Sequence, residues 1–303
     1  MIQHICYLLR SLKKTSKVSV IMKKNIKGSF LSLSPKAKIF EEIQLQQPKW
    51  WSLLCNDKEL YIDIRKDNYF NVYYYGGSVA RIDYANGFVA KTHQKYLGDE
   101  KPRGKSKKGT SIFKYDLFDL DELDNEKIEN IKNYIKSDYL RHITDENPAE
   151  KWIQGKMIME KSSYIDSEFQ FNKDPEIGYL RIDLVELSEG VLSFIELKGI
   201  FDSRLRNDLK RNSNIPEIVE QMAKYKLFIN KYEAEIYSYY KKLLEIKQTL
   251  GLIAKERTLI GLNKNPKLII ADTYCKMTRK REERISDIRK LLENYNIDYE
   301  ITK

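Results

Sequence analysis

Residues 179–202 carry charged side chains inside segments that otherwise have the composition of buried strands. Two runs rich in Leu, Ile, Val and Phe flank the turn Ser188-Glu189-Gly190, which predicts a β-hairpin because such turn residues tolerate unusual backbone angles. Asp183 falls in the first predicted strand, and Glu196 and Lys198 fall in the second. Since side chains alternate along a strand, Glu196 and Lys198 share one face. Burying these charges is costly unless they pair or bind a metal, so the hairpin predicts a functional site.

The residue types at this hairpin predict metal-dependent hydrolysis of phosphodiester bonds. The carboxylates of Asp183 and Glu196 would repel each other when brought together, and a divalent cation removes that repulsion. Oxygen ligands of this kind suit Mg²⁺ or Mn²⁺. Such a metal polarises a phosphoryl oxygen and lowers the pKa of a bound water. Lys198 can hold the attacking water or neutralise the charge that develops on the phosphate.

The spacing of these residues resembles the core of the PD-(D/E)XK nuclease superfamily, which has the restriction-endonuclease-like fold. Asp183 is followed, after twelve intervening residues, by Glu196-Leu197-Lys198. Ile182 occupies the place of the family's proline, a position that is commonly degenerate. The resemblance implies that Asp183, Glu196 and the backbone carbonyl of Leu197 are metal ligands. It also implies that Lys198 is the catalytic lysine.

A second motif follows the hairpin, on a predicted helix that starts near Ile215-Pro216-Glu217. Gln221 and Tyr225 lie four residues apart and therefore share one face of that helix. The pair resembles the QxxxY motif of the RecB-like and lambda-exonuclease-like branch of the superfamily. The resemblance implies that this face borders the metal site and the substrate, which places Gln221 and Tyr225 among the catalytic residues.

A helix before the hairpin supplies a further candidate. The sequence predicts it over residues 148–162, with Asn147 as N-cap and Pro148 as the first helical residue. The superfamily often contributes another acidic residue from this helix. The resemblance assigns that role, as a catalytic residue and metal ligand, to Glu150, with Glu160 as the alternative. The branch often has a histidine before the core, which this part of the chain lacks, so Glu150 would serve instead. An acid in a first helical turn also complements the helix dipole, which is the structural explanation for Glu150.

These elements predict an α/β fold class in two domains. In residues 144–303 we expect a nuclease domain with a restriction-endonuclease-like mixed sheet flanked by helices, as the resemblance implies. In residues 31–143 we expect an α+β domain of unknown role. We interpret residues 1–30 as a basic tail that is either disordered or an arm that touches phosphates. Met22 is also typical of a start of translation, so the sequence leaves residues 1–21 open.

Closely spaced turn signals predict that the N-terminal domain contains an antiparallel meander behind a helix over residues 36–47. The expected strands, about four, cover residues 59–65, 69–75, 79–84 and 88–93. We interpret the aromatic side chains on these strands as core and edge packing, with the stacking of nucleic-acid bases as the alternative. The other expected elements are helices over residues 124–142, 232–253 and 279–294, and strands over residues 267–272 and 298–302.

The net charge of +10 is compatible with a nucleic-acid partner, but its distribution weakens that argument. Residues 1–30 carry seven basic and no acidic side chains, so the remaining chain carries only +3. The candidate contacts to a nucleic-acid backbone are Lys105, Lys107, Lys108, Arg204, Arg206, Lys210 and Arg211. A merely solvated loop is the alternative for the three lysines, and the acidic residues 116–126 could pair with that loop.

Three scattered cysteines without a CxxC pair favour a reducing cytoplasm, and the chain has no apolar stretch that suits a membrane span. We expect a nuclease that requires Mg²⁺ or Mn²⁺ and acts on nucleic acid, with DNA as the favoured substrate and RNA as the alternative that the sequence leaves open. By analogy, it would be a restriction or phage-defence effector. A homodimer would suit double-strand cleavage, but no residue demands it. The alternatives are a nucleic-acid-binding module on an inactive nuclease fold, and an interaction protein whose hairpin charges form a structural salt bridge.

Overall fold

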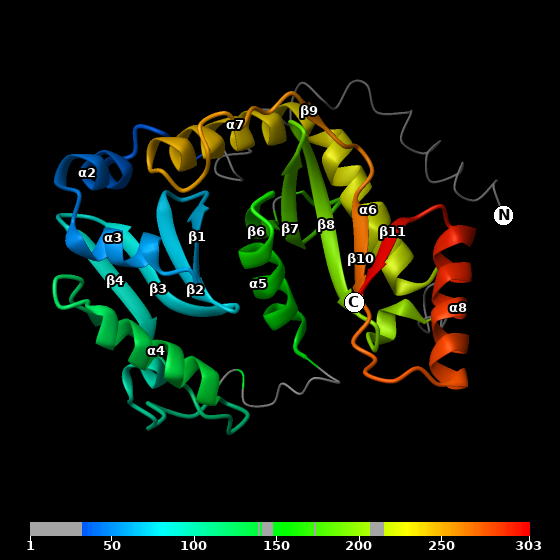
Figure 1. Cartoon of the computed structure of the whole chain (residues 1–303), viewed down its shortest axis with the longest axis horizontal. Coiled ribbons are helices and arrows are strands. Elements are labelled where there is room, and N and C mark those ends of the chain that lie inside the picture. Colours follow the sequence, from blue (N-terminus) through cyan, green and yellow to red (C-terminus); the bar gives the residue numbers. More distant parts are fainter. Residues whose placement is uncertain (1–31, 139, 141–147, 173, 207–214) are drawn as a thin grey trace.

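The computed structural model describes residues 32–138, 140, 148–172, 174–206 and 215–303, which form two β-sheets with helices around them (Figure 1). This arrangement confirms the expected mixed α/β class. The basic tail and the predicted boundary between residues 143 and 144 lie outside the described residues, so the division into two domains stays a prediction. Within those ranges no helix has both the length and the apolar composition that crossing a membrane requires.

The first sheet has five antiparallel strands in the order β1-β2-β3-β4-β5. Its strands are β1 (Leu60–Arg65), β2 (Tyr69–Tyr74), β3 (Gly77–Tyr84), β4 (Phe88–His93) and β5 (Tyr115–Phe118). The first four are the expected meander. The expected number of strands was too low, because β5 is a short edge strand that stays half exposed and therefore has little apolar periodicity.

Three helices cover one face of this sheet, namely α2 (Lys38–Gln46), α3 (Lys49–Asn56) and α4 (Asn125–Asp138). Phe70, Val72 and Tyr74 alternate along β2 toward these helices and are buried, which confirms core packing for two of the meander's aromatic residues. Trp51 of α3 lies 4.8 Å from Phe70 between ring centroids. The opposite face of β2, which includes Tyr73, is turned toward the second sheet and lines a pocket there.

The second sheet is mixed, with the order β11-β10-β8-β7-β6 and with β9 paired to β8. Its strands are β6 (Tyr164–Phe171), β7 (Leu180–Ser188), β8 (Val191–Gly199), β9 (Gly261–Leu262), β10 (Lys267–Ala271) and β11 (Asp298–Thr302). Strand β7 runs antiparallel to both of its neighbours, β6 and β8, whereas β8, β10 and β11 run parallel. The predicted hairpin is therefore confirmed as β7 and β8, and it lies within the sheet, where both of its strands are paired on both sides.

The helices of this half are α5 (Glu150–Glu160), α6 (Glu217–Lys231), α7 (Glu233–Thr249) and α8 (Arg279–Asn294). Helix α8 has the predicted bounds. The predicted start of α5 was wrong by two residues. Ala149 is the N-cap, because its backbone is still extended (φ −64, ψ 139), and the helix begins only at Glu150. Asn147, the predicted N-cap, lies outside the described residues.

The two sheets meet at a set of buried polar side chains, here called the junction cluster (Asp63, Arg65, Asp166, Ser167, Tyr240 and Lys247). Arg65 on β1 donates to Asp63 at 3.0 Å and to Asp166 on β6 at 3.4 Å. Lys247 on α7 donates to the carbonyl of Ile165 on β6 at 2.6 Å. Since these bonds join β1, β6 and α7, the two halves of the chain are held together by polar contacts as well as by a shared apolar core.

Helix α5 lies against the turn between β2 and β3, and a glycine permits this contact. A Cβ atom on Gly155 would lie 2.7 Å from the Cα of Tyr75, whose ring stacks on Trp152 with 5.7 Å between centroids. Real Cβ atoms do not approach backbone that closely, so any larger residue must displace α5 or the turn. The position of α5, and with it that of Glu150, therefore depends on Gly155.

We expect Gly155→Ala to lower the free energy of unfolding by about 1 kcal/mol, because overpacking costs about 2 kcal/mol at the middle of its usual range and alanine returns about 1 kcal/mol of helix propensity. Denaturant unfolding measures the change. Gly199→Ala is the matched control, since a Cβ there meets no atom within 4 Å. A Gly155→Ala protein as stable as the wild type would contradict the close packing of α5 on the turn.

Candidate active site

The hairpin brings its three charged side chains together. Leu184 of β7 pairs with Ile195 of β8, and this register places Asp183 beside the second half of β8. The backbone N–H of Leu197 donates to Asp183 Oδ2 at 2.9 Å, which fixes the carboxylate against β8. Asp183, Glu196 and Lys198 are only 6%, 1% and 1% exposed. The cost of burying three charges is therefore offset only by the contacts they make with one another and with their neighbours.

The ammonium of Lys198 is the centre of these contacts. Its Nζ lies 3.6 Å from Asp183 Oδ2, 3.5 Å from Glu150 Oε1 and 2.6 Å from the carbonyl oxygen of Leu197, and it also contacts Glu196 Oε1. Three carboxylates and one carbonyl from two strands and one helix thus converge on a single cationic group. The sequence predicted every member of this set.

Helix α6 fixes the carboxylate of Glu196 from the other side. Gln221 Nε2 donates to Glu196 Oε1 at 2.6 Å and to the Tyr225 hydroxyl at 3.0 Å. The Tyr225 hydroxyl lies 2.5 Å from Glu196 Oε2 and also contacts the carbonyl oxygen of Arg181. Both oxygens of Glu196 therefore have a partner from α6, and the two motif residues face the hairpin as the shared helical face predicts.

Helix α5 contributes two side chains four residues apart. Glu150 reaches Lys198, and the side-chain amide of Gln154, which is 2% exposed, donates to the backbone carbonyl of Asp183. Glu160, the alternative to Glu150, is exposed near the other end of the helix and pairs with Lys156 at 3.7 Å. Sequence analysis did not identify Gln154. Its spacing of four from Glu150, the same spacing that joins Gln221 to Tyr225, is the signal that could have identified it.

Burial and neighbouring charges shift the acid–base properties of the site. Burial, reinforced by the carboxylate of Glu196, raises the pKa of Asp183 to about 7. Burial also raises the pKa of Glu150, against the opposing charge of Lys198. Burial alone would lower the pKa of Lys198, but Glu196 and Asp183 outweigh it and raise that pKa, so the side chain is an ammonium at neutral pH. Burial and Glu196 raise the pKa of Tyr225, which keeps its proton and can donate it in a hydrogen bond.

The donor set is compatible with a hard divalent cation. Carboxylate oxygens of Asp183, Glu196 and Glu150 and the Leu197 carbonyl are the ligand types that Mg²⁺ and Mn²⁺ prefer. Within the described ranges, however, no group of three or more His, Cys, Asp or Glu side chains is arranged to hold a metal ion. At the hairpin the ammonium of Lys198 lies among the carboxylates and supplies positive charge there. Lys198 would have to give up part of these contacts for a metal to bind.

The basic residues proposed to contact a nucleic acid fall into three groups. Arg204, on the short helix η4 (Ser203–Leu205), is near the hairpin, but its guanidinium is held by Asp202 at 2.6 Å. Arg206 follows it and is exposed. Lys210 and Arg211 lie outside the described residues.

The remaining candidates, Lys105, Lys107 and Lys108, are exposed on a loop near α4, apart from β7 and β8 (Figure 1). Arg103 of the same loop makes two hydrogen bonds to Asp116, at 2.6 and 2.5 Å. The acidic stretch therefore pairs with the basic loop through Arg103. The structure does not bring these lysines to the hairpin site.

Comparison of the chain with family models, with curated proteins and with solved structures finds no match.

Proposed function

We propose that the protein is a metal-dependent nuclease that hydrolyses phosphodiester bonds, with DNA as its substrate. One observation carries the proposal, the convergence of Asp183, Glu196, Glu150 and the Leu197 carbonyl on the ammonium of Lys198. A structural salt bridge needs one carboxylate for one ammonium, whereas this site gathers three around it at a considerable desolvation cost. Two of these carboxylates are buried and Glu150 is 33% exposed. Ionisable groups whose pKa values are shifted by burial and by specific charged partners are typical of functional sites.

The fold of the C-terminal half supports the same proposal. The site lies on the central hairpin of a mixed sheet flanked by helices, which is the arrangement that the resemblance to PD-(D/E)XK nucleases implies. Gln221 and Tyr225 approach from the helix after the hairpin and Glu150 from the helix before it. We therefore include a restriction-endonuclease-like fold in the proposal. A restriction or phage-defence role, a cytoplasmic location and a homodimer stay predictions.

The chain's own residues define the hydrolytic step. A divalent cation held by Asp183, Glu196 and Glu150 would supply Lewis acidity at the scissile phosphate. A water oxygen adds to phosphorus, one bridging P–O bond breaks, and the leaving oxygen takes a proton while the water loses one. Lys198 donates hydrogen bonds that hold the water or the charge developing on the phosphate. Tyr225 and Gln221 keep the Glu196 carboxylate in one orientation throughout.

A second candidate is a nucleic-acid-binding module on an inactive nuclease fold. It is favoured by the arrangement of the acidic side chains, which in the described part of the chain do not form a ready-made metal group. If the Lys198 ammonium never leaves its position among the carboxylates, the site stays a neutralised cluster and no metal binds. The first candidate predicts cleavage that depends on a metal, whereas the second predicts binding of nucleic acid without cleavage.

Incubation of supercoiled plasmid with Mg²⁺, with Mn²⁺ or with EDTA tests this difference. We expect nicked or linear product with either metal and none with EDTA. Linear duplex, single-stranded DNA and RNA follow as substrates if the plasmid is not cut. Equal product in EDTA would contradict the metal-dependent proposal. Gel shifts without cleavage of any of these substrates would favour the binding module.

A further inference from the structure

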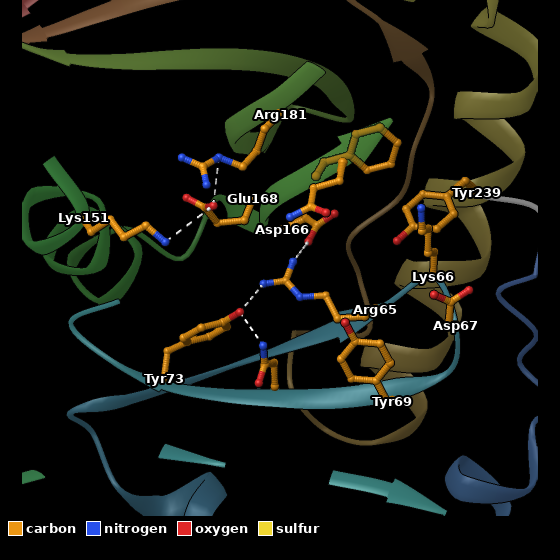
Figure 2. A pocket seen from close by; sticks show the side chains of 13 residues that line it. Arg65, Lys66, Asp67, Tyr69, Tyr73, Lys151, Asp166, Glu168, Arg181 and Tyr239 are labelled. Atoms are coloured by element: carbon orange, nitrogen blue, oxygen red, sulfur yellow. Dashed lines mark hydrogen bonds and ion pairs between the residues drawn. The ribbon is translucent and has the colours of Figure 1, made fainter. Parts of the chain in front are cut away.

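A pocket of about 250 Å³ opens between the two sheets, next to the candidate active site. Its lining comes from β1, β2, α5, β6, β7 and α7, so it exists only because the two halves pack together. Figure 2 shows Lys151, Glu168 and Arg181 on one side of it and Tyr69, Lys66 and Asp67 on the other. None of the functional residues predicted from the sequence lines this pocket.

The pocket adjoins the site through two of its lining residues. Lys151 follows Glu150 on α5, and Arg181 precedes Asp183 by two positions on β7, so its side chain leaves the same face of the strand. The carbonyl of Arg181 is also contacted by the Tyr225 hydroxyl. A strand of nucleic acid with its scissile phosphate at Lys198 would therefore have a neighbouring nucleotide at this pocket.

Lys151 and Arg181 are held by one carboxylate. Glu168 Oε2 lies 3.6 Å from Lys151 Nζ and 3.2 Å from Arg181 Nε, as the dashed lines of Figure 2 mark. The two basic side chains are 40% and 42% exposed, so solvent and ligands reach them, whereas Glu168 is only 14% exposed. Two cations converging on one anionic group at a pocket edge is the arrangement that also binds a phosphate.

Glu168 has an unusual backbone conformation that points to function. Its φ is +53, in the left-handed region that non-glycine residues rarely adopt. Its neighbours Ser167 and Phe169 pair with Leu184 and Ile182, so Glu168 lies opposite Asp183 in the sheet. Strained conformations of this kind cost of order 1–3 kcal/mol and cluster at ligand-binding and catalytic sites. The conformation is explained if Glu168 holds Lys151 and Arg181 ready for a phosphate.

The size and lining of the pocket indicate a single nucleotide. Its volume lies just below the roughly 300 Å³ at which ligand pockets start, so a base pair does not fit. The phenol ring of Tyr69 lines it and supplies aromatic surface for a base, although one of its faces carries the guanidinium of Arg81. The ring of Tyr73 also lines it but already stacks on Tyr61, with 5.1 Å between centroids. The guanidinium of Arg65 is already bonded to Asp63, Tyr73 and Asp166. Of the other cations that line the pocket, Lys66 lies on the opposite side, whereas Lys151 and Arg181 lie together beside Glu168.

We propose that this pocket binds one unpaired nucleotide of the substrate strand, with its phosphate on Lys151 and Arg181 in place of Glu168. The inference rests on the proposed function, because it takes the nucleotide to be a neighbour of the scissile phosphate. It narrows the substrate class to single strands, or to duplexes that are unpaired at this position. Glu168 competes with the phosphate for the two cations and limits the affinity for nucleic acid.

Fluorescence anisotropy of labelled oligonucleotides, single-stranded and duplex, tests the proposal in EDTA, where the proposed cleavage does not occur. We expect the Lys151→Ala/Arg181→Ala protein to bind the single strand about ten- to hundred-fold more weakly, as for the loss of two charge-assisted hydrogen bonds. We expect Glu168→Gln to bind it more tightly, because the competing charge is gone. The matched control is Lys156→Ala/Arg279→Ala, which removes two exposed cations paired with Glu160 and Glu283 outside the pocket.

Unchanged affinity of the Lys151→Ala/Arg181→Ala protein would overturn the inference, and so would weaker binding by Glu168→Gln. An equal loss on duplex and single strand would also overturn it, since a general backbone contact does not discriminate them. These outcomes are separate from the proposed nuclease activity, because binding is measured without metal and without cleavage. If the protein cuts DNA but these variants do not change its affinity for oligonucleotides, the proposed nuclease function stands and the proposed nucleotide site in the pocket is wrong.

Discussion

Replacement of Lys198 by methionine is expected to lower metal-dependent cleavage by about 10²–10³-fold, the loss typical when one group that stabilises transition-state charge is removed. Methionine keeps the length of the side chain and tolerates a buried site, so the loss is one of charge rather than of packing. Asp183→Asn should cause a comparable loss. Asparagine can still accept the hydrogen bond from the Leu197 N–H, so the hairpin is expected to keep its register. Single-turnover cleavage of labelled DNA measures both effects.

Whereas Lys198→Met is expected to lower cleavage, it is expected to strengthen the binding of a metal ion. Without the ammonium, Glu150, Asp183 and Glu196 lose the cation that now separates them, and the site gains one unit of negative charge. Calorimetric titration with Mn²⁺ should therefore show tighter binding by Lys198→Met than by the wild type. Lower cleavage with tighter metal binding would assign a catalytic role to Lys198. Weaker metal binding together with lower cleavage would indicate that the site had collapsed.

Lys247 provides the matched control for this experiment. It is also a buried lysine, 5% exposed, and it donates to the carbonyl of Ile165 at 2.6 Å in the junction cluster. Lys247→Met should lower the free energy of unfolding and leave cleavage per folded molecule unchanged. Loss of cleavage in both methionine variants would mean that buried charge in general, rather than the hairpin site, supports the activity. Cleavage that survives in Lys198→Met would contradict the hairpin site directly.

The hairpin and its motif could be predicted because local sequence determines them. The strands β7 and β8 are continuous apolar runs around a turn, so the exceptions at Asp183, Glu196 and Lys198 are conspicuous. The spacing of four between Gln221 and Tyr225 fixes their common face on any helix. Proximity of the helix to the hairpin was implied by a family resemblance. The structure brings the two together through hydrogen bonds to Glu196.

Strand β6 could not be predicted, because the side chains that bond to its buried polar residues come from distant parts of the chain. Asp166 and Ser167 lie in its centre and give it the composition of a loop. They are buried because Arg65 on β1 and Tyr240 on α7 bond to Asp166 and because Asp63 accepts from Ser167. A local sequence pattern cannot predict hydrogen-bond partners that lie 74 to 104 positions away in the chain. Glu168 was missed for the same reason, since its role depends on Lys151 and on the pocket between the sheets.

The arginine of the junction cluster is expected to have the largest effect on stability. Arg65→Ala should lower the free energy of unfolding by about 3–5 kcal/mol, because removing one partner of a buried ion pair leaves an uncompensated charge. Arg65 is 12% exposed, and it separates the carboxylates of Asp63 and Asp166. Arg81 is the matched control, since it pairs with Asp83 two positions along β3 at 2.9 Å but is 44% exposed. Arg81→Ala should cost at most about 1 kcal/mol, as is usual for surface pairs.

The pH dependence of this effect tests its electrostatic origin. Burial, and then the charge of Asp63, raises the pKa of Asp166 from 3.8 to about 7. Between pH 3.8 and about 7 the folded protein keeps the proton on Asp166, whereas the unfolded chain releases it. The free energy of unfolding therefore falls as the pH rises through this window, and Asp166 contributes at most about 1.4 kcal/mol per pH unit to that fall. Without Arg65 the pKa of Asp166 rises further, and the fall continues above pH 7. The difference in free energy of unfolding between wild type and Arg65→Ala should thus be larger at pH 8 than at pH 6.

Adding Asp166→Asn to Arg65→Ala should recover stability at pH 8, because the unpaired carboxylate is then gone. Denaturant unfolding at the two pH values measures both effects. A difference that does not change with pH would show that lost packing, rather than unpaired charge, destabilises Arg65→Ala.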